Sequence, residues 1–197
     1  MDEVTQGEVM DDSDAYLVAR AIRRDHEAFS QLYDRYFRRI YRYVWLKVSN
    51  KADAEDVTSA VFLNAWRCID RFSPKHDGSF LAWLFKLAHN ALIDRYRRER
   101  DTISLDAAET GRLEETSHQP EDDLESRLTI MAVRQALTRL TSEQRDVVLL
   151  RFIEGFSARE VGDILGKHEG AVRGMQFRAI EAMRRALNLA REGDPLD

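Results

Sequence analysis

The stretch TSEQRDVVLLRFIEGFSAREVGDILGKHEGAVRGMQFRAIEAMRRAL, residues 141–187, decides the fold of the C-terminal half. Thr141 with Gln144 and Ser157 with Glu160 each have capping-box spacing. In that motif a hydroxyl and a longer side chain satisfy the free amide groups at the start of a helix. The stretch therefore predicts helices that begin at both places, with a third helix behind them.

The second and third helices have the order of a helix-turn-helix. A short helix ends at Gly166, which suits the left-handed residue that closes a helix, and a longer basic helix begins near Glu169. On the outward side of this third helix, arginine can bind guanine and glutamine can bind adenine. The outward candidates are Arg173, Gln176 and Arg178. The alternative is three packed helices whose arginines are only solvated. In the first helix, Val147, Val148, Leu150 and Phe152 are expected to face a core.

The composition favours an all-α protein. The 197 residues include only 3 prolines and 9 glycines, and no strand-like alternation of apolar residues is present. The single cysteine, Cys68, excludes a disulfide framework and favours a reducing compartment. No apolar run has the length of a membrane span, so no membrane insertion is expected.

The charge is unevenly distributed along the chain. The net charge is −5, yet basic residues concentrate in residues 35–42, 95–100 and 173–185. Local fields decide phosphate binding, because salt screens charges beyond ~8–10 Å. The overall acidity should make free DNA binding weak, which suits a protein that reads DNA with a partner's help.

The sequence of the N-terminal half predicts four helices. Ser13 is expected to cap a short helix through Ile22, and Asp25 to open a long helix whose regularly spaced aromatic residues pack in a core. A third helix is expected to begin near Asp53, and a turn region, residues 72–79, to precede the fourth.

The fourth helix, residues 80–101, carries an aromatic residue, an amide and arginines near a second face. These are Trp83, Asn90, Asp94, Arg97 and Arg98. Aromatic rings stack on exposed bases, amides read base edges and arginines hold phosphates, so the face suits single-stranded nucleic acid. The alternative is a solvated helix end, where cations suit the helix dipole.

These patterns predict two small helical domains joined by a flexible acidic linker, the C-terminal one a helix-turn-helix domain. The expected boundaries are a disordered tail at 1–12, a domain at 13–100, a linker at 101–119, a domain at 120–188 and a tail at 189–197. Pro120 is expected to open a first helix of the C-terminal domain that runs to about Arg139.

Four sequence blocks together resemble a known family. They are AFSQLYDRYFRRIYRYV, ADAEDVTSAVFLNAW, FLAWLFKLAHNALIDRYRRER and LTSEQRDVVLLRFIEGFSAREVGDILGKHEGAVRGMQFRAI. In this order, across an acidic linker, the chain resembles an extracytoplasmic-function sigma factor of the sigma-70 family over residues 15–100 and 124–187. The resemblance implies an alternative sigma factor that binds core RNA polymerase and directs promoter recognition, strand opening and transcription initiation.

The resemblance also implies partners and a location. The partners would be the clamp helices of the beta-prime subunit, the beta flap, promoter DNA and an anti-sigma factor that holds the chain inactive. The protein would be cytoplasmic and nucleoid-associated when bound to polymerase. The linker would pass through polymerase toward its active site.

By the same resemblance, three sets of residues would form the sites. For the minus-thirty-five duplex they are Glu169, Gly170, Arg173, Gln176, Phe177 and Arg178. For the melted minus-ten strand they are Phe72, Lys75, Trp83, Lys86, Asn90, Asp94, Arg97 and Arg98, with a pocket for a flipped base in residues 72–77. For polymerase they are Asp53, Asp56 and Asn64.

The chain departs from the family pattern at several positions. His89 replaces the usual arginine before Asn90, and Ser59-Ala60 stand where many members have Gln-Glu. Lys167-His168 stand where members commonly have an apolar residue and a Ser, Thr or Pro cap. The start of the recognition helix therefore differs from the family's.

Three other classes of function remain open from the residues. A stand-alone helix-turn-helix regulator would use its N-terminal half to sense a ligand or to dimerise, which leaves the face around Asn90 unexplained. A helical adaptor would bind only protein. An enzyme is disfavoured, because the sequence has no Gly-rich phosphate loop, metal-ligand cluster or nucleophile motif, and its 5 histidines are scattered. No cofactor is predicted.

Overall fold

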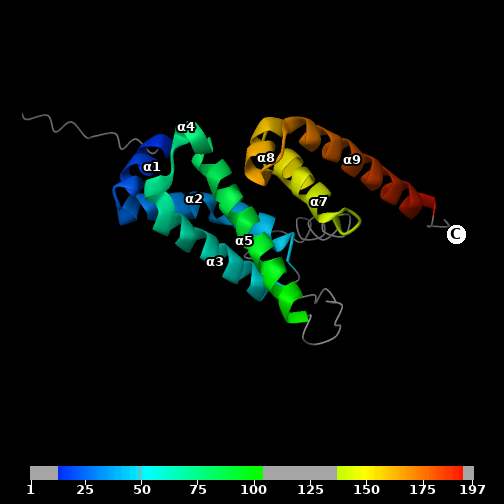
Figure 1. Cartoon of the computed structure of the whole chain (residues 1–197), viewed down its shortest axis with the longest axis horizontal. Coiled ribbons are helices and arrows are strands. Elements are labelled where there is room, and N and C mark those ends of the chain that lie inside the picture. The colour runs from blue at the N-terminus through cyan, green and yellow to red at the C-terminus, as the bar shows by residue number, and fades with distance from the viewer. Residues whose placement is uncertain (1–12, 49, 104–136, 193–197) are drawn as a thin grey trace, which may run out of the picture.

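The computed structural model describes residues 13–48, 50–103 and 137–192, and its elements in these ranges are all helices (Figure 1). They are α1 (Asp14–Ile22), α2 (His26–Trp45), α3 (Lys51–Cys68), η1 (Ile69–Arg71), α4 (Pro74–Asp77), α5 (Phe80–Ile103), α7 (Ser142–Val148), η2 (Leu149–Ile153), α8 (Ala158–Leu165) and α9 (Glu169–Glu192). The prediction of an all-α chain with two helical units is confirmed. The predicted tail at 1–12, the linker from 104 on, and the helix from Pro120 as far as residue 136 lie outside the described residues.

Side-chain caps set the helix starts of the N-terminal half. Ser13 caps α1, and Asp25 caps α2 by accepting from two backbone amides at 3.0 and 3.2 Å. Asn50 caps α3, so this helix begins at Lys51, two residues before Asp53. The predicted turn region before α5 contains the short helix α4, whose first residue is Pro74.

The N-terminal core lies between α1, α2, α3 and α5. The predicted aromatic stripe of α2 packs as expected, since Tyr43 is 1% exposed and Tyr33 meets Phe62 edge-on at 4.7 Å between ring centroids. The apolar side of α5 is fully buried. Its members are Leu84, Phe85, Ala88 and Leu92. This packing fixes which face of α5 remains for solvent and partners.

The C-terminal half forms the predicted helix-turn-helix. Both capping boxes are present, Thr141 with Gln144 and Ser157 with Glu160. Gly166 ends α8 in the left-handed conformation at φ 64° and ψ 37°. α9 then begins at Glu169, as predicted, and continues to Glu192, into the range expected to be a tail.

The expectation that Phe152 faces the core is wrong, because the helix around it is not α-helical. Residues Leu149–Ile153 form a π-helical turn, in which the amide of Glu154 donates to the carbonyl oxygen of Leu149 at 3.0 Å. The wider turn rotates the following side chains relative to an α-helix. Phe152, which follows the start of this turn, is therefore turned outward and is 56% exposed, while Leu149 and Leu150 are buried.

The two halves pack against each other, with α8 lying on α5 (Figure 1). The aromatic ring of Phe85 on α5 meets Phe156, which precedes α8, edge-on at 5.3 Å between centroids. Both rings are buried. The apolar core therefore continues from one half of the chain into the other.

Candidate nucleic-acid interface

The recognition helix α9 begins with a cap made by His168. The backbone amide of Gly170 donates to Nδ1 of His168 at 3.2 Å, and the carbonyl oxygen of His168 accepts from Ala171 and Val172. The imidazole thus satisfies one of the amide groups that an α-helix leaves free at its start. His168 therefore caps α9, although the sequence has no Ser, Thr or Pro at this position.

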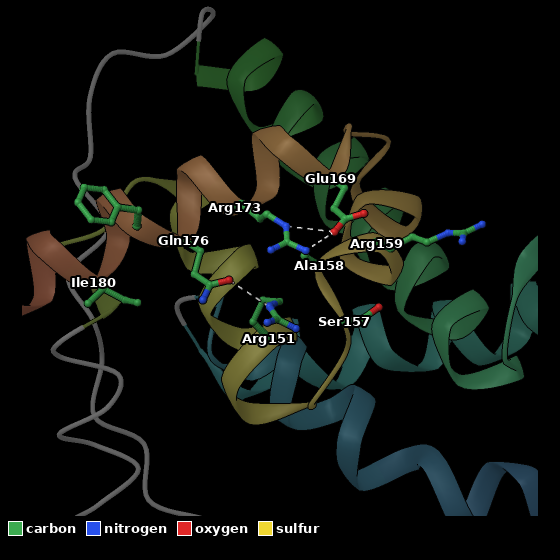
Figure 2. Close-up of a pocket in the computed structure, with 9 residues that line it drawn as sticks. Arg151, Ser157, Ala158, Arg159, Glu169, Arg173, Gln176 and Ile180 are labelled. Atoms are coloured by element: carbon green, nitrogen blue, oxygen red, sulfur yellow. Dashed lines mark hydrogen bonds and ion pairs between the residues drawn. The ribbon is translucent and has the colours of Figure 1, made fainter.

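A hollow lies on the outer side of the helix-turn-helix (Figure 2). It is lined by Arg151, Ser157, Ala158, Arg159, Glu169, Arg173, Gln176, Phe177 and Ile180. These residues come from η2, α8 with its cap, and α9. The hollow thus combines four predicted duplex-binding residues of α9 with basic side chains of the preceding elements.

Arg151 fixes the position of Gln176. Its Nε donates to Oε1 of Gln176 at 3.1 Å, and its Nη1 donates to the carbonyl oxygen of Phe156. Figure 2 shows the two side chains pointing toward each other across the hollow. Because the amide oxygen of Gln176 is engaged, its NH₂ group remains to donate to an acceptor such as adenine N7.

Arg173 is exposed and paired within its own helix. Its Nε and Nη2 donate to Oε1 of Glu169 at 3.1 and 2.6 Å, and its side chain is 70% exposed. The hydrogen bonds from Arg173 lower the pKa of Glu169. Glu169, the first residue of α9, thus holds the guanidinium of Arg173 one turn further along the helix.

The remaining predicted duplex-binding residues lie on the open part of α9. Gly170, Phe177 and Arg178 are exposed, and Phe177 is 67% exposed. Sequence reasoning missed Arg151 and Arg159 as members of this surface. Arg159 could have been predicted from the sequence, because it is an outward residue of the short helix. The position of Arg151 could not, because it depends on the π-helical turn.

A second polar surface follows the solvent side of α5. Five predicted strand-binding residues are exposed there at helical spacing: Lys86, Asn90, Asp94, Arg97 and Arg98. Asp94 holds the arginines nearby, since its carboxylate lies 3.9 Å from Nη1 of Arg97 and its carbonyl oxygen accepts from Nε of Arg98 at 3.2 Å. Lys75, on α4 just before α5, is also exposed. We call the five residues of α5 the α5 strip.

Phe72 and Trp83 do not lie on this surface. They are 5% and 7% exposed, and their ring centroids are 5.2 Å apart. Phe80 lies 5.6 Å from each of them. Trp83 was expected to present an open ring on which a base could stack. In this structure its ring is buried instead, because three aromatic rings at the start of α5 pack against one another.

The predicted polymerase-binding residues lie on α3. Asp56 and Asn64 are exposed, whereas Asp53 is engaged by Arg95 at 2.7 Å and by the side chain of Asn50 at 3.0 Å. Leu63, beside Asn64, is 51% exposed, and sequence reasoning missed it. Leu63 could have been found in the sequence, because it is an apolar residue that lies outside the buried stripe of α3.

The fold and these surfaces define a helix-turn-helix DNA-binding protein with a second helical domain that carries its own polar strip. None of the helices in the described ranges combines the length and apolar character that crossing a bilayer requires.

Comparison with known proteins identifies the family. Residues 32–102 match the family model of Sigma-70 region 2, and residues 130–183 match that of Sigma-70, region 4. The ECF RNA polymerase sigma factor SigW of Bacillus subtilis is 30% identical over 83% of this chain and 90% of SigW. The corresponding factor BldN of Streptomyces coelicolor is 37% identical over 87% of this chain, which spans 64% of BldN.

A solved structure shows the same architecture. CnrH, in complex with the cytosolic domain of CnrY, superposes with a TM-score of 0.69 at 28% identity, covering 89% of this chain and 97% of CnrH. The chain belongs to the extracytoplasmic-function sigma factors of the sigma-70 family. It is therefore a promoter-directing sigma factor.

Proposed function

We propose that the two polar surfaces divide promoter recognition between them. The outer side of α9, with Arg173 and Gln176, binds the minus-thirty-five duplex in the major groove. The α5 strip holds the melted minus-ten strand, with Asn90 reading a base and Arg97 and Arg98 holding phosphates. The observation that carries the proposal is that both surfaces are exposed on separate helical units of one sigma factor.

The exposed face of α3 binds core polymerase in this proposal. Asp56 and Asn64 supply polar contacts, and Leu63 supplies an apolar anchor. Burial of the Leu63 side chain against polymerase would remove apolar surface from water, which favours association. Asp53 contributes by holding Arg95 in place. The beta flap would be contacted by the C-terminal domain.

The melted strand needs an unstacked base to be held in a pocket. Residues 72–77 remain our candidate for that pocket, although Phe72 and Trp83 are packed together in this structure. Capture of a base there requires these rings to separate. Lys75, exposed on α4, is placed to meet the phosphate next to such a base.

An anti-sigma factor is the partner that would control this activity. CnrH was solved with the cytosolic domain of a second protein, so this fold can accommodate a protein partner. The function requires binding to polymerase and to DNA without catalysis by this chain. Acting at promoters places the protein in the cytoplasm, on the nucleoid when bound to polymerase.

The test is transcription in vitro with core polymerase and a library of random promoters. The sigma factor should yield transcripts from templates that share two elements, one upstream duplex element and one melted element. Binding of DNA without polymerase-dependent transcripts would instead favour a stand-alone helix-turn-helix regulator.

A further inference from the structure

Arg151 joins the π-helical turn η2 to the segment before α8 and to the recognition helix α9. Its Nη1 donates to the carbonyl oxygen of Phe156, and its Nε donates to Oε1 of Gln176 at 3.1 Å. Figure 2 shows the contact with Gln176 at the hollow of the recognition helix. π-Helical turns are rare and occur frequently at functional sites. Because the guanidinium is anchored at two atoms, its direction toward Gln176 is fixed by the fold.

This contact decides which end of the Gln176 amide is turned toward the protein. A guanidinium has only donors, so it pairs with the amide oxygen and not with the NH₂ group. Within the part of the chain that the structure describes, that NH₂ group makes no hydrogen bond. Gln176 is half-buried and lines the hollow, so it offers two N–H donors to a ligand that enters there.

The other charges around the hollow leave the amide of Gln176 to Arg151. The guanidinium of Arg173, one turn earlier on α9, is paired with Oε1 of Glu169 at 2.6 Å. A hydrogen bond from a charged donor is stronger than one between neutral groups, and a half-buried setting reduces competition from water. The orientation of the amide should therefore persist when a duplex enters the hollow.

An amide held in this way matches some base edges and conflicts with others. In the major groove guanine presents two acceptors, N7 and O6, whereas adenine presents the acceptor N7 beside the donor N6–H₂. A bidentate glutamine–adenine pair needs the amide oxygen to accept from N6 while the NH₂ group donates to N7. With the oxygen turned to Arg151, the amino group of adenine would face donors and lose its partner, which costs affinity.

We propose that Arg151 is a positioning residue that sets the base preference of Gln176. By holding the amide oxygen, it makes Gln176 a donor that selects guanine over adenine at one position of the upstream duplex element. The inference rests on the proposed function, because it deepens the reading of the minus-thirty-five element by α9. Arg151 acts through the amide and does not itself touch the base.

Base preference is measured with the full-length chain bound to core polymerase, on promoter fragments recovered from the random library. Each position of the upstream element is changed in turn to each of the four bases. Gln176→Ala identifies the position that Gln176 reads, because the preference there is flattened in this variant. The parent chain should favour guanine over adenine at that position by on the order of 10-fold.

Arg151→Met removes both hydrogen bonds and keeps an unbranched side chain. It should lower the guanine-to-adenine affinity ratio at this position to about 1, because the freed amide can pair with either purine. The double variant Arg151→Met/Gln176→Ala should show the same ratio as Gln176→Ala alone, since Arg151 acts only through that amide. A ratio of affinities for two templates does not depend on the folded fraction of a variant, so a loss of stability alone does not move it.

The matched control is Arg159→Met, which removes an exposed cation of the same hollow. Loss of a phosphate-binding charge weakens binding to all sequences alike, so the guanine-to-adenine ratio should stay at the parent value. A fall of the ratio in Arg159→Met equal to that in Arg151→Met would assign the effect to charge and overturn the positioning role.

Gln176→Glu tests the same point in a variant that keeps the contact. Its carboxylate still accepts from Arg151 but has no donor, so the preference for guanine should be lost while the anchor to η2 remains. Retention of the guanine preference in this variant or in Arg151→Met would overturn the proposal. A parent chain that prefers adenine at the position read by Gln176 would overturn it as well.

The outcomes separate this proposal from the proposed function. A parent chain that yields no transcripts from the promoter library would contradict the proposed function. A chain that starts transcription and whose upstream preference responds to Arg173→Ala, but at no position to Gln176→Ala, would contradict the role of Arg151 alone.

Discussion

Gly162 lies where the turn after α8 passes closest to that helix. A Cβ at this position would lie 2.5 Å from the backbone carbonyl oxygen of Lys167, whose amide in turn donates to the carbonyl oxygen of Gly162 at 2.8 Å. The backbone there cannot move away without losing the turn of the helix-turn-helix. Gly162→Ala should lower the free energy of unfolding by about 1–3 kcal/mol in urea denaturation.

Gly174 of α9 provides the matched control. A Cβ there would meet only the flexible side chain of Arg178, at 3.5 Å. Alanine favours the helix over glycine by ~1 kcal/mol, so Gly174→Ala should leave stability unchanged or raise it. Equal losses in the two variants would show that the contact at Lys167 is not the cause.

His89 makes stability depend on pH. Burial lowers its pKa below the ordinary value of 6.5; Lys47 and Lys167 add to this shift, and Asp146 opposes it. Below about pH 6.5 the unfolded chain therefore binds a proton that the folded chain does not. The free energy of unfolding should fall as the pH drops from 7 toward the folded-state pKa, by up to ~1.4 kcal/mol per pH unit.

Urea denaturation between pH 5 and 7.5 measures this dependence. His89→Gln removes the titrating group and should flatten the profile in that window. Within the described residues Nδ1 of His89 has no hydrogen-bond partner, so the substitution removes no hydrogen bond at that atom. An unaltered slope in the variant would assign the pH dependence to other groups.

The recognition helix α9 should show its role through base preference. Arg173→Ala removes the exposed guanidinium near the start of the helix, and it should cost ~1–3 kcal/mol at one base position if the contact is bidentate. Promoter binding by the polymerase complex, measured over single-base variants of the upstream element, checks this. Arg184→Ala is the control on the same helix, because Arg184 is also exposed and also paired with a glutamate, Glu181, at 3.1 Å. Equal loss on all sequences would make Arg173 a phosphate contact.

The helix α5 should show its role in strand opening. Asn90 is exposed at the middle of the α5 strip. Asn90→Ala removes an amide able to read a base edge, so permanganate reactivity of promoter thymines should fall while affinity for core polymerase stays the same. Normal reactivity in this variant would remove Asn90 from the strand-binding site.

Sequence predicts those elements whose signals are local. The caps at Thr141 and Ser157 and the left-handed Gly166 each depend on residues within one turn, and all three are present. Phe152 was misplaced because the π-helical turn changes the helical period. The packing of Trp83 against Phe72 depends on a bend between two helices, which periodicity along one helix does not contain.

Contacts between the two halves had no signal in the sequence. Glu154 lies more than a hundred positions from Arg39, so no local pattern relates the two residues. Their pairing depends on how two separately predicted helical units dock. The exposed polar residues of α5 and α9 were predictable, because helical spacing alone places them on an outward face. The polar interface between the halves was not, because it depends on how the halves dock.

At the scale of the whole molecule, the two halves are joined by ion pairs as well as by apolar packing. Arg39, Arg42 and Lys47 of the N-terminal half are paired with Glu154 and Asp146 of the C-terminal half. The rings of Phe85 and Phe156 add an apolar contact between the halves.

Glu154→Gln should therefore weaken the contact between the two halves. It removes the charge from a carboxylate that is 1% exposed and that accepts from Arg39 at 2.7 Å and from Arg42 at 2.6 Å. The free energy of unfolding measured in urea should fall by about 1.5–3 kcal/mol, because hydrogen bonds to a charged group are worth about that much. Glu143→Gln breaks an exposed ion pair with Lys167 within the C-terminal half and should change the free energy of unfolding by less than ~1 kcal/mol. Equal losses in the two variants would show that the buried contact between the halves adds no stability of its own.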